Sequence, residues 1–145
     1  MNFGWINWIN AGAVACLVGI NILAAHKGIA GSMASRHMLI NVLEQVGRYG
    51  CMALMIFPVA AEGWKFGFRS VGEMFLWLLG TAAALICYGG LWMQKRQGGR
   101  GALYGLALLP VCLFFMNGLL LRHGLLIGFS LLFGVCHVMI LRENG

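Results

Sequence analysis

Apolar residues fall into long continuous runs separated by short polar stretches, and this pattern predicts an all-α integral membrane protein. Each run is close to the ~20 residues that a helix needs to cross a ~30 Å hydrocarbon core. Backbone N–H and C=O groups cannot stay unpaired in lipid, so the runs must form helices. The chain is expected to be one transmembrane helical domain over residues 1–145, a bundle with five spans at approximately 5–25, 38–61, 71–93, 102–121 and 125–141.

The breaks between the runs support these bounds. Gly28 and Gly31 loosen the first connection, Pro58 falls near the end of the second run, and residues 94–100 form a polar, basic break. Residues 122–124 predict a tight turn, which is the weakest boundary because it is so short. The alternative is four spans, with the last stretch forming one bent or re-entrant unit.

Composition strengthens the membrane assignment. Residues of the AVILMFWYC class make up 61% of the chain, charged residues only 10%, and the mean hydropathy is +0.85. A soluble domain has about a quarter of its residues charged, so these charges could not cover a water-exposed surface. The first residues lack the basic region of a signal peptide, and the first run is therefore expected to be a retained span. Nothing resembles an organelle signal, so a multi-pass protein of the cell (plasma) membrane is expected.

The formal charge of +6 is better explained by basic loops that set the orientation of the chain in the membrane than by nucleic-acid binding. The ten Lys and Arg residues are spread over the connections and form no cluster, which argues against a nucleic-acid partner. Cytoplasmic loops carry an excess of Lys and Arg. With the N-terminus outside and the C-terminus cytoplasmic, the inner side holds Lys27, Arg36, Lys95, Arg96, Arg100 and Arg142, and the outer side holds only Lys65, Arg69 and Arg122.

The second run carries the most informative polar residues. Asn41, Glu44, Gln45 and Arg48 fall within a ~100° arc of a helix, so they form one stripe. Glu44 and Arg48 are spaced i, i+4 with the acid first, an order that favours a side-chain pair. Pairing lowers the cost of a lone Arg inside a membrane, which is at least ~2.5–3.5 kcal/mol. Alternatively, the pair only neutralises itself near the interface, with Arg48 extending toward water.

Residues on other spans match this stripe in depth. They predict a ligand-binding pocket in the cytoplasmic half of the bundle, open toward the cytoplasm. Structural alternatives remain for each additional residue: asparagines can bond between helices, tyrosines can lie at the interface, and a histidine can cap a helix. The predicted site consists of Asn21, Asn41, Glu44, Gln45, Arg48, Tyr88, Tyr104 and His137.

No metal, cofactor or catalytic residue is expected. The five cysteines contain no Cys-x-x-Cys pair, and each predicted span carries one of them near its middle, where Cys acts as a small hydrophobe. The chain has no Asp at all, whereas Mg²⁺-dependent phosphoryl chemistry relies on carboxylates. A non-enzymatic protein is therefore favoured over an enzyme.

Three functions fit these observations. The first is binding or transport of a small solute, ion or lipid, with Arg48 holding an anionic group such as a carboxylate or phosphate. The second is an accessory or immunity-type subunit that binds another membrane protein. The third, least favoured, is an intramembrane enzyme acting on a lipid headgroup, with His137 as base and Arg48 as anion clamp.

Small residues recur every four positions, a spacing that lets helix backbones approach closely. Most of these contacts should be intramolecular. One could serve a homo-oligomer or a partner membrane protein, because five short helices bury little on their own. Membrane lipids are the remaining expected partners. The spaced residues are Ala11, Ala15 and Gly19; Gly80 and Ala84; Gly101 and Gly105; and Gly124 and Gly128.

Overall fold

A computed structural model describes residues 7–28, 34–57, 70–96 and 101–144, and these ranges form five α-helices with no strand among them. The predicted all-α class is confirmed, and the helix bounds agree with the predicted runs to within a few residues. Residues 5 and 6, Gly31, Pro58 and the predicted end of the second run lie outside the described residues. The helices are α1 (Trp8–His26), α2 (Met38–Ile56), α3 (Val71–Arg96), α4 (Gly101–Leu120) and α5 (Gly124–Asn144).

Four of these helices, α1, α3, α4 and α5, are long and apolar enough to cross a membrane. Large apolar side chains on their outer faces are exposed, including Leu23, Ile86 and Val135, as expected for surfaces in contact with lipid. The chain is thus a membrane protein. The helix that falls short is α2, whose polar stripe dilutes its apolar character. The predicted boundary at residues 122–124 separates α4, which has 20 residues, from α5, which has 21.

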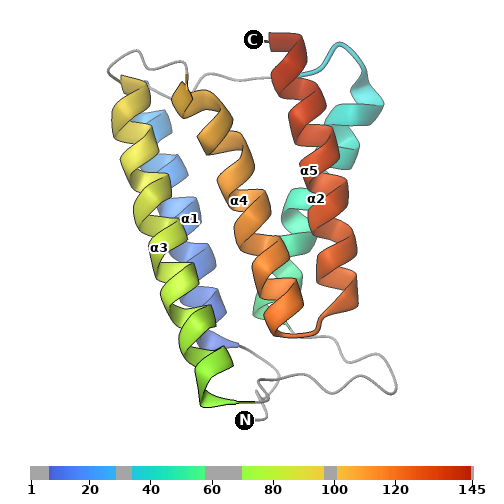
Figure 1. The fold of residues 1–145 in the computed structure, drawn as a ribbon. Helices are drawn as coiled ribbons and strands as arrows, with labels where there is room; N and C mark the ends of the chain where they lie inside the picture. Colours follow the sequence, from blue (N-terminus) through green and yellow to red (C-terminus); the bar gives the residue numbers. More distant parts are fainter. Residues whose placement is uncertain (1–6, 29–33, 58–69, 97–100, 145) are drawn as a thin grey trace.

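Consecutive helices run antiparallel, as Figure 1 shows. α1, α3 and α5 end, and α2 and α4 begin, at one end of the bundle, which we call the C-terminal end. Arg122 lies at the opposite end, in the turn that joins α4 to α5, where it has a positive φ of 54°. Lys65, Arg69 and Arg100, used in the charge comparison, lie outside the described residues.

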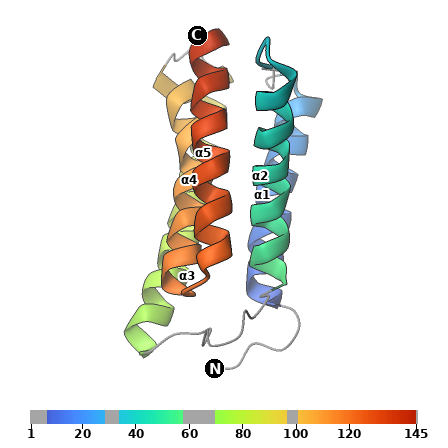
Figure 2. The same ribbon diagram turned by 90° about the vertical axis from the view of Figure 1, so that its right-hand side faces the viewer.

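The helices form a ring that is closed unevenly. α3 packs on α4, α4 on α5 and α5 on α2 along extensive seams. Among the described helices, α1 contacts only α2 and α3, and more sparsely. Figure 2 shows α1 and α2 on one side of the bundle, facing the layer that contains α4 and α5, and Figure 1 shows that the two helices are apart along most of their length. The ring therefore consists of a tightly packed set of four helices and one loosely held helix, α1.

Glycines explain why four of the helices pack so closely. A Cβ added to Gly47 would lie 2.9 Å from the Cα of Phe133 on α5, so only glycine fits. At Gly50, Gly80, Gly105, Gly118 and Gly134, an added Cβ would instead meet a side chain of the neighbouring helix at less than 3 Å. Of the positions predicted from four-residue spacing, Gly80 and Gly105 make such contacts, whereas Gly19, Gly101 and Gly128 face open space.

The five cysteines are free thiols. Cys51 and Cys136 are buried, while Cys16, Cys87 and Cys112 are exposed on apolar helix faces. The core between the helices contains Leu17, Cys51, Met55, Leu113, Phe114, Leu126 and Phe133.

Candidate functional site

A cavity of about 720 Å³ lies between the helices in the half of the bundle near the C-terminal end. All five helices line it. The cavity reaches the C-terminal end of the bundle. It is lined there by Ala25 near the end of α1, Lys95 near the end of α3 and Leu103 near the start of α4. Its polar lining consists of Asn21, Asn41, Glu44, Gln45, Arg48, Tyr49, Tyr88, Lys95 and His137.

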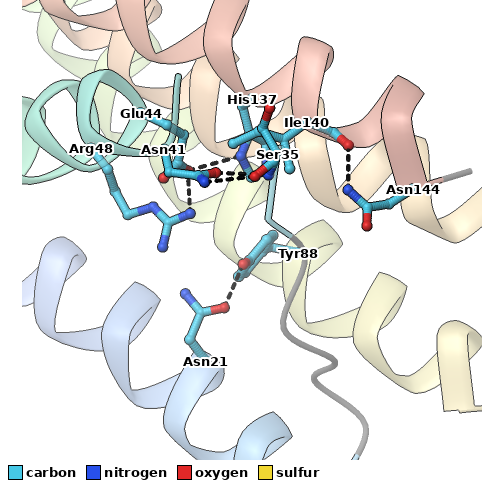
Figure 3. Close-up of polar contacts among 9 residues, drawn as sticks. All are labelled: Asn21, Ser35, Asn41, Glu44, Arg48, Tyr88, His137, Ile140 and Asn144. Carbon is cyan, nitrogen blue, oxygen red and sulfur yellow. Dashed lines mark hydrogen bonds and ion pairs between the residues drawn. The ribbon is translucent and has the colours of Figure 1, made fainter. Parts of the chain in front are cut away.

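Glu44 is the centre of the polar lining. It lies on the face of α2 that also carries Gly47 and Cys51, and this face is buried against α5. Its side chain is only 3% exposed. The close approach at Gly47 brings α5 near enough for His137 Nδ1 to lie 2.9 Å from Glu44 Oε1. A guanidinium N–H of Arg48 donates to the same oxygen (Figure 3). Among the described residues, no hydrogen bond reaches Oε2 of Glu44.

Arg48 is held in place but keeps donors available. Its guanidinium carbon lies 5.7 Å from the ring centre of Phe133, and its side chain is 33% exposed. The His137 ring lies 5.0 Å from the same Phe133 ring. A guanidinium has five N–H donors, and within the described part of the chain only the pair with Glu44 uses one. The others can bind an anion in the cavity.

The opposite wall is built from α1 and α3. Tyr88 donates its hydroxyl hydrogen to Asn21 Oδ1 over 2.6 Å, and Asn21 Nδ2 donates to the backbone oxygen of Leu17 over 3.0 Å. The Trp92 ring lies edge-on to Tyr88, with ring centres 6.3 Å apart. Lys95 Nζ lies 4.9 Å from the centre of the Trp92 ring. This wall therefore adds a second cation to the cavity.

Asn41 has a structural task at the cavity rim. Its side-chain amide accepts from the backbone N–H of Ser35 and donates to the Ser35 carbonyl, both over 2.8 Å. Asn144 Nδ2 donates to the backbone oxygen of Ala34, and Glu143 accepts from the backbone N–H of Arg36, each over 3.0 Å. These bonds fix the segment before α2 against the end of α5.

The structure brings seven of the eight predicted site residues to one cavity: Asn21, Asn41, Glu44, Gln45, Arg48, Tyr88 and His137. Tyr104 does not line it and is 57% exposed. It lies one position, and therefore ~100° around α4, from Leu103, which faces the cavity. Lys95 and Trp92 were not predicted as site residues, because a basic residue and an indole at a helix end are typical of orientation and of the membrane interface.

The remaining lining is apolar. It includes Leu17 on α1, Leu106 and Pro110 on α4, Phe114 below them, and Phe133 on α5. A concave, mainly apolar space with a few convergent polar groups is typical of small-molecule sites, and ~300–1,000 Å³ is their usual volume. Glu44 and His137, in direct contact, can also share or exchange a proton. In the described ranges, no three His, Cys, Asp or Glu side chains are grouped to hold a metal ion.

Other buried polar residues lie away from this cavity. Trp77 Nε1 donates to Asn117 Oδ1 over 2.5 Å, joining α3 to α4. Asn10 is fully buried, and its side-chain amide has no hydrogen-bond partner within the described residues.

Comparison with known proteins gives no relative: no protein-family model, no curated protein and no solved structure matches the chain.

Proposed function

We propose that this protein binds a small anionic molecule in the cavity between its five helices, with Arg48 as the anion-binding group. The observation that carries the proposal is the meeting of Arg48, Glu44 and His137, from two helices, in one cavity. Charged groups inside a membrane are costly, and by default they indicate a functional site. If Glu44 and Arg48 only neutralised each other's charge, neither His137 on α5 nor a cavity beside the pair would be needed.

Each residue has a distinct role in this proposal. Arg48 binds a carboxylate or phosphate through its remaining donors, since guanidinium geometry suits both groups. Glu44 orients Arg48 and fixes His137. His137 supplies a further hydrogen bond or a proton. Lys95 adds long-range attraction, and together Arg48 and Lys95 outweigh the single carboxylate of Glu44 among these groups.

The proposal extends to topology. With the C-terminal end of the bundle in the cytoplasm, Lys27, Arg36, Lys95 and Arg142 lie on the cytoplasmic side, and Arg122 lies outside. This arrangement follows the distribution of basic residues in membrane proteins. All five helices then cross the membrane, with α2 shielded in part by its neighbours, and the cavity opens to the cytoplasm. We further propose the cell membrane as the location. In transport, the ligand would cross the packed core below the cavity, in a monomer or an oligomer.

The test is equilibrium binding of inorganic phosphate and acetate to the full chain in lipid nanodiscs. Arg48→Gln should weaken binding by about 10- to 150-fold, because a hydrogen bond to a charged group contributes ~1.5–3 kcal/mol. Arg122→Gln is the matched control, since it removes an arginine paired with Glu73 at the other end of the bundle. Equal binding by wild type and Arg48→Gln would remove the role given to Arg48, and no anion binding at all would refute the proposed function.

A further inference from the structure

We infer that the ligand is a single-chain amphiphile with an anionic headgroup, and that it reaches the cavity sideways from the surrounding lipid, between α1 and α2. This inference rests on the proposed function, because it places the headgroup at Arg48. It adds the chemical class of the ligand and the path that the ligand takes. The supporting observations are the apolar α4 wall of the cavity, its lateral opening and the loose packing of α1.

The cavity is divided between its walls. Its charged and polar lining residues come from α1, α2, α3 and α5, whereas every lining residue on α4 is apolar: Leu103, Leu106, Ala107, Pro110 and Phe114. On α4 the lining extends from Leu103 to Phe114, which is ~16 Å at 1.5 Å per residue. A small hydrophilic anion would leave that apolar length without a partner, but an aliphatic chain would fill it.

The cavity also reaches the side of the bundle. Six of its lining residues are exposed. Ala25 and Ala34 lie at the C-terminal end, and the other four lie on the side of the bundle: Val18 and Ile22 on α1, and Gln45 and Tyr49 on α2. Ile22 is 57% exposed and Tyr49 is 62% exposed. A residue that both lines a cavity and is exposed on a lateral face marks an opening in that face. We call this opening, defined by Val18, Ile22, Gln45 and Tyr49, the lateral window.

α1 is the helix best able to move aside at this window. It contacts only α2 and α3, sparsely in both cases. The glycine contacts that hold the other four helices together are missing from it, since nothing lies within 4 Å of a Cβ added at Gly12 or Gly19. Elements with few packed contacts are the ones that open at low free-energy cost.

The window lies at the level of the charged groups. Gln45, Arg48 and Tyr49 are spaced i, i+3 and i+4 on α2, so they lie about one helical turn apart, and Arg48 is partly exposed. An amphiphile in the adjacent leaflet presents its anionic headgroup near the membrane surface and its chain toward the bilayer centre. Moving sideways, it would meet Arg48 with its headgroup and the deeper part of the α4 wall, at Pro110 and Phe114, with its chain, without reversing its orientation.

The first arm of the experiment measures equilibrium binding of radiolabelled dodecyl phosphate and inorganic phosphate to the full chain in nanodiscs, with empty nanodiscs subtracted. Dodecyl phosphate should bind at least tenfold tighter than inorganic phosphate. Arg48→Gln should weaken both. Dodecyltrimethylammonium, which has the same chain and a cationic headgroup, should not bind above the empty-disc level.

The second arm measures how fast dodecyl phosphate associates when it is supplied in donor vesicles. Ile22→Trp narrows the lateral window and should slow association at least threefold. Leu23→Trp is the matched control, because Leu23 is the next residue on α1, is 61% exposed and does not line the cavity. Both positions are exposed, so both variants should fold, and an unchanged helical circular dichroism spectrum verifies that they do.

The outcomes separate the two levels of the proposal. Equal binding of inorganic and dodecyl phosphate, or binding of the cationic amphiphile, would overturn the ligand class while leaving the anion site in place. Equal association rates for wild type and both tryptophan variants would overturn the lateral path. Absence of binding by every anion would overturn the proposed function together with the inference.

Discussion

His137 Nδ1 lies 2.9 Å from Glu44 Oε1, a contact that joins residues 93 positions apart and connects α5 to α2 at the level of the cavity. Arg48 bonds to the same carboxylate oxygen from within α2. One buried carboxylate therefore positions both the imidazole and the guanidinium. Removing it should affect both groups together, and this dependence can be measured.

The Glu44–His137 contact should show up as a coupling free energy. Glu44→Gln, His137→Gln and the double variant form a double-mutant cycle, read by unfolding of the protein in mixed micelles. We expect a coupling of about 0.5–3 kcal/mol, the range found for residues that share a hydrogen-bond network. Gln at either position keeps the approximate size of the side chain. Additive effects of the two substitutions would contradict a direct contact between these side chains.

The α2–α5 seam should not accept a methyl group at Gly47. An added Cβ would meet the backbone of Phe133 at 2.9 Å, and backbone cannot move aside as a flexible side chain can. Gly47→Ala should lower the free energy of unfolding by about 1–2 kcal/mol, since overpacking costs ~1–3 kcal/mol and helix propensity returns part of it. It should also weaken anion binding.

Gly19→Ala is the matched control for this substitution. Gly19 is also within a helix, and nothing lies within 4 Å of an added Cβ. The variant should gain up to about 1 kcal/mol from helix propensity alone. Equal stability changes in Gly19→Ala and Gly47→Ala would show that the α2–α5 seam is not closely packed.

The interhelical hydrogen bond between Trp77 and Asn117 should contribute modestly to stability. Asn117 is fully buried, and besides accepting from Trp77 it donates to the Leu113 carbonyl over 2.9 Å. Asn117→Leu should cost about 0.6–1.7 kcal/mol, as found for hydrogen bonds between membrane helices. Thermal unfolding is the measurement, with Leu119→Ala, on the exposed side of the same helix, as the control. A stability gain in Asn117→Leu would contradict a stabilising bond.

His123 should make stability depend on pH. It lies in the turn between α4 and α5, and its Nδ1 accepts the backbone N–H of Leu126 over 3.2 Å, which caps the start of α5. Burial lowers the pKa of His123 below its usual value of about 6.5. The unfolded chain therefore binds the proton at higher pH than the folded one. The stability that the neutral cap provides is present above pH ~6.5, the pKa in the unfolded chain, and is lost as the pH falls below that value through the lower pKa of the folded state.

His123→Asn tests this expectation. Asn is a favoured cap residue and does not titrate. Unfolding should be compared near pH ~7.5 and pH ~5.5, on either side of the usual pKa of His. Wild type should lose more stability on acidification than the variant does. The difference between the two proteins isolates His123 from the other three histidines of the chain. Parallel losses would exclude a titrating cap at this position.

The sequence by itself determined the class of structure and the positions of the helices. Apolar runs of about twenty residues have one solution in lipid, because backbone polar groups must be paired within the segment. The Glu44–Arg48 pair was also predictable, since i, i+4 neighbours lie on the same side of a single helix. α2 mixes apolar residues with a polar stripe. Its hydropathy is therefore too low for it to be identified as a membrane span, although all nineteen of its residues are helical.

Only the tertiary structure decided which residues of different helices meet. Depth along the membrane is readable from sequence, but rotation about each helix axis is not, so Tyr104 matched the others in depth and yet faces away from the cavity. His137 reaches Glu44 because glycines at 47 and 50 allow α5 to approach, and four-residue spacing did not single these glycines out. The lateral window is present because α1 packs only sparsely against its neighbours. Packing between helices is set by side-chain shape at each seam, and a linear pattern of polarity does not contain that information.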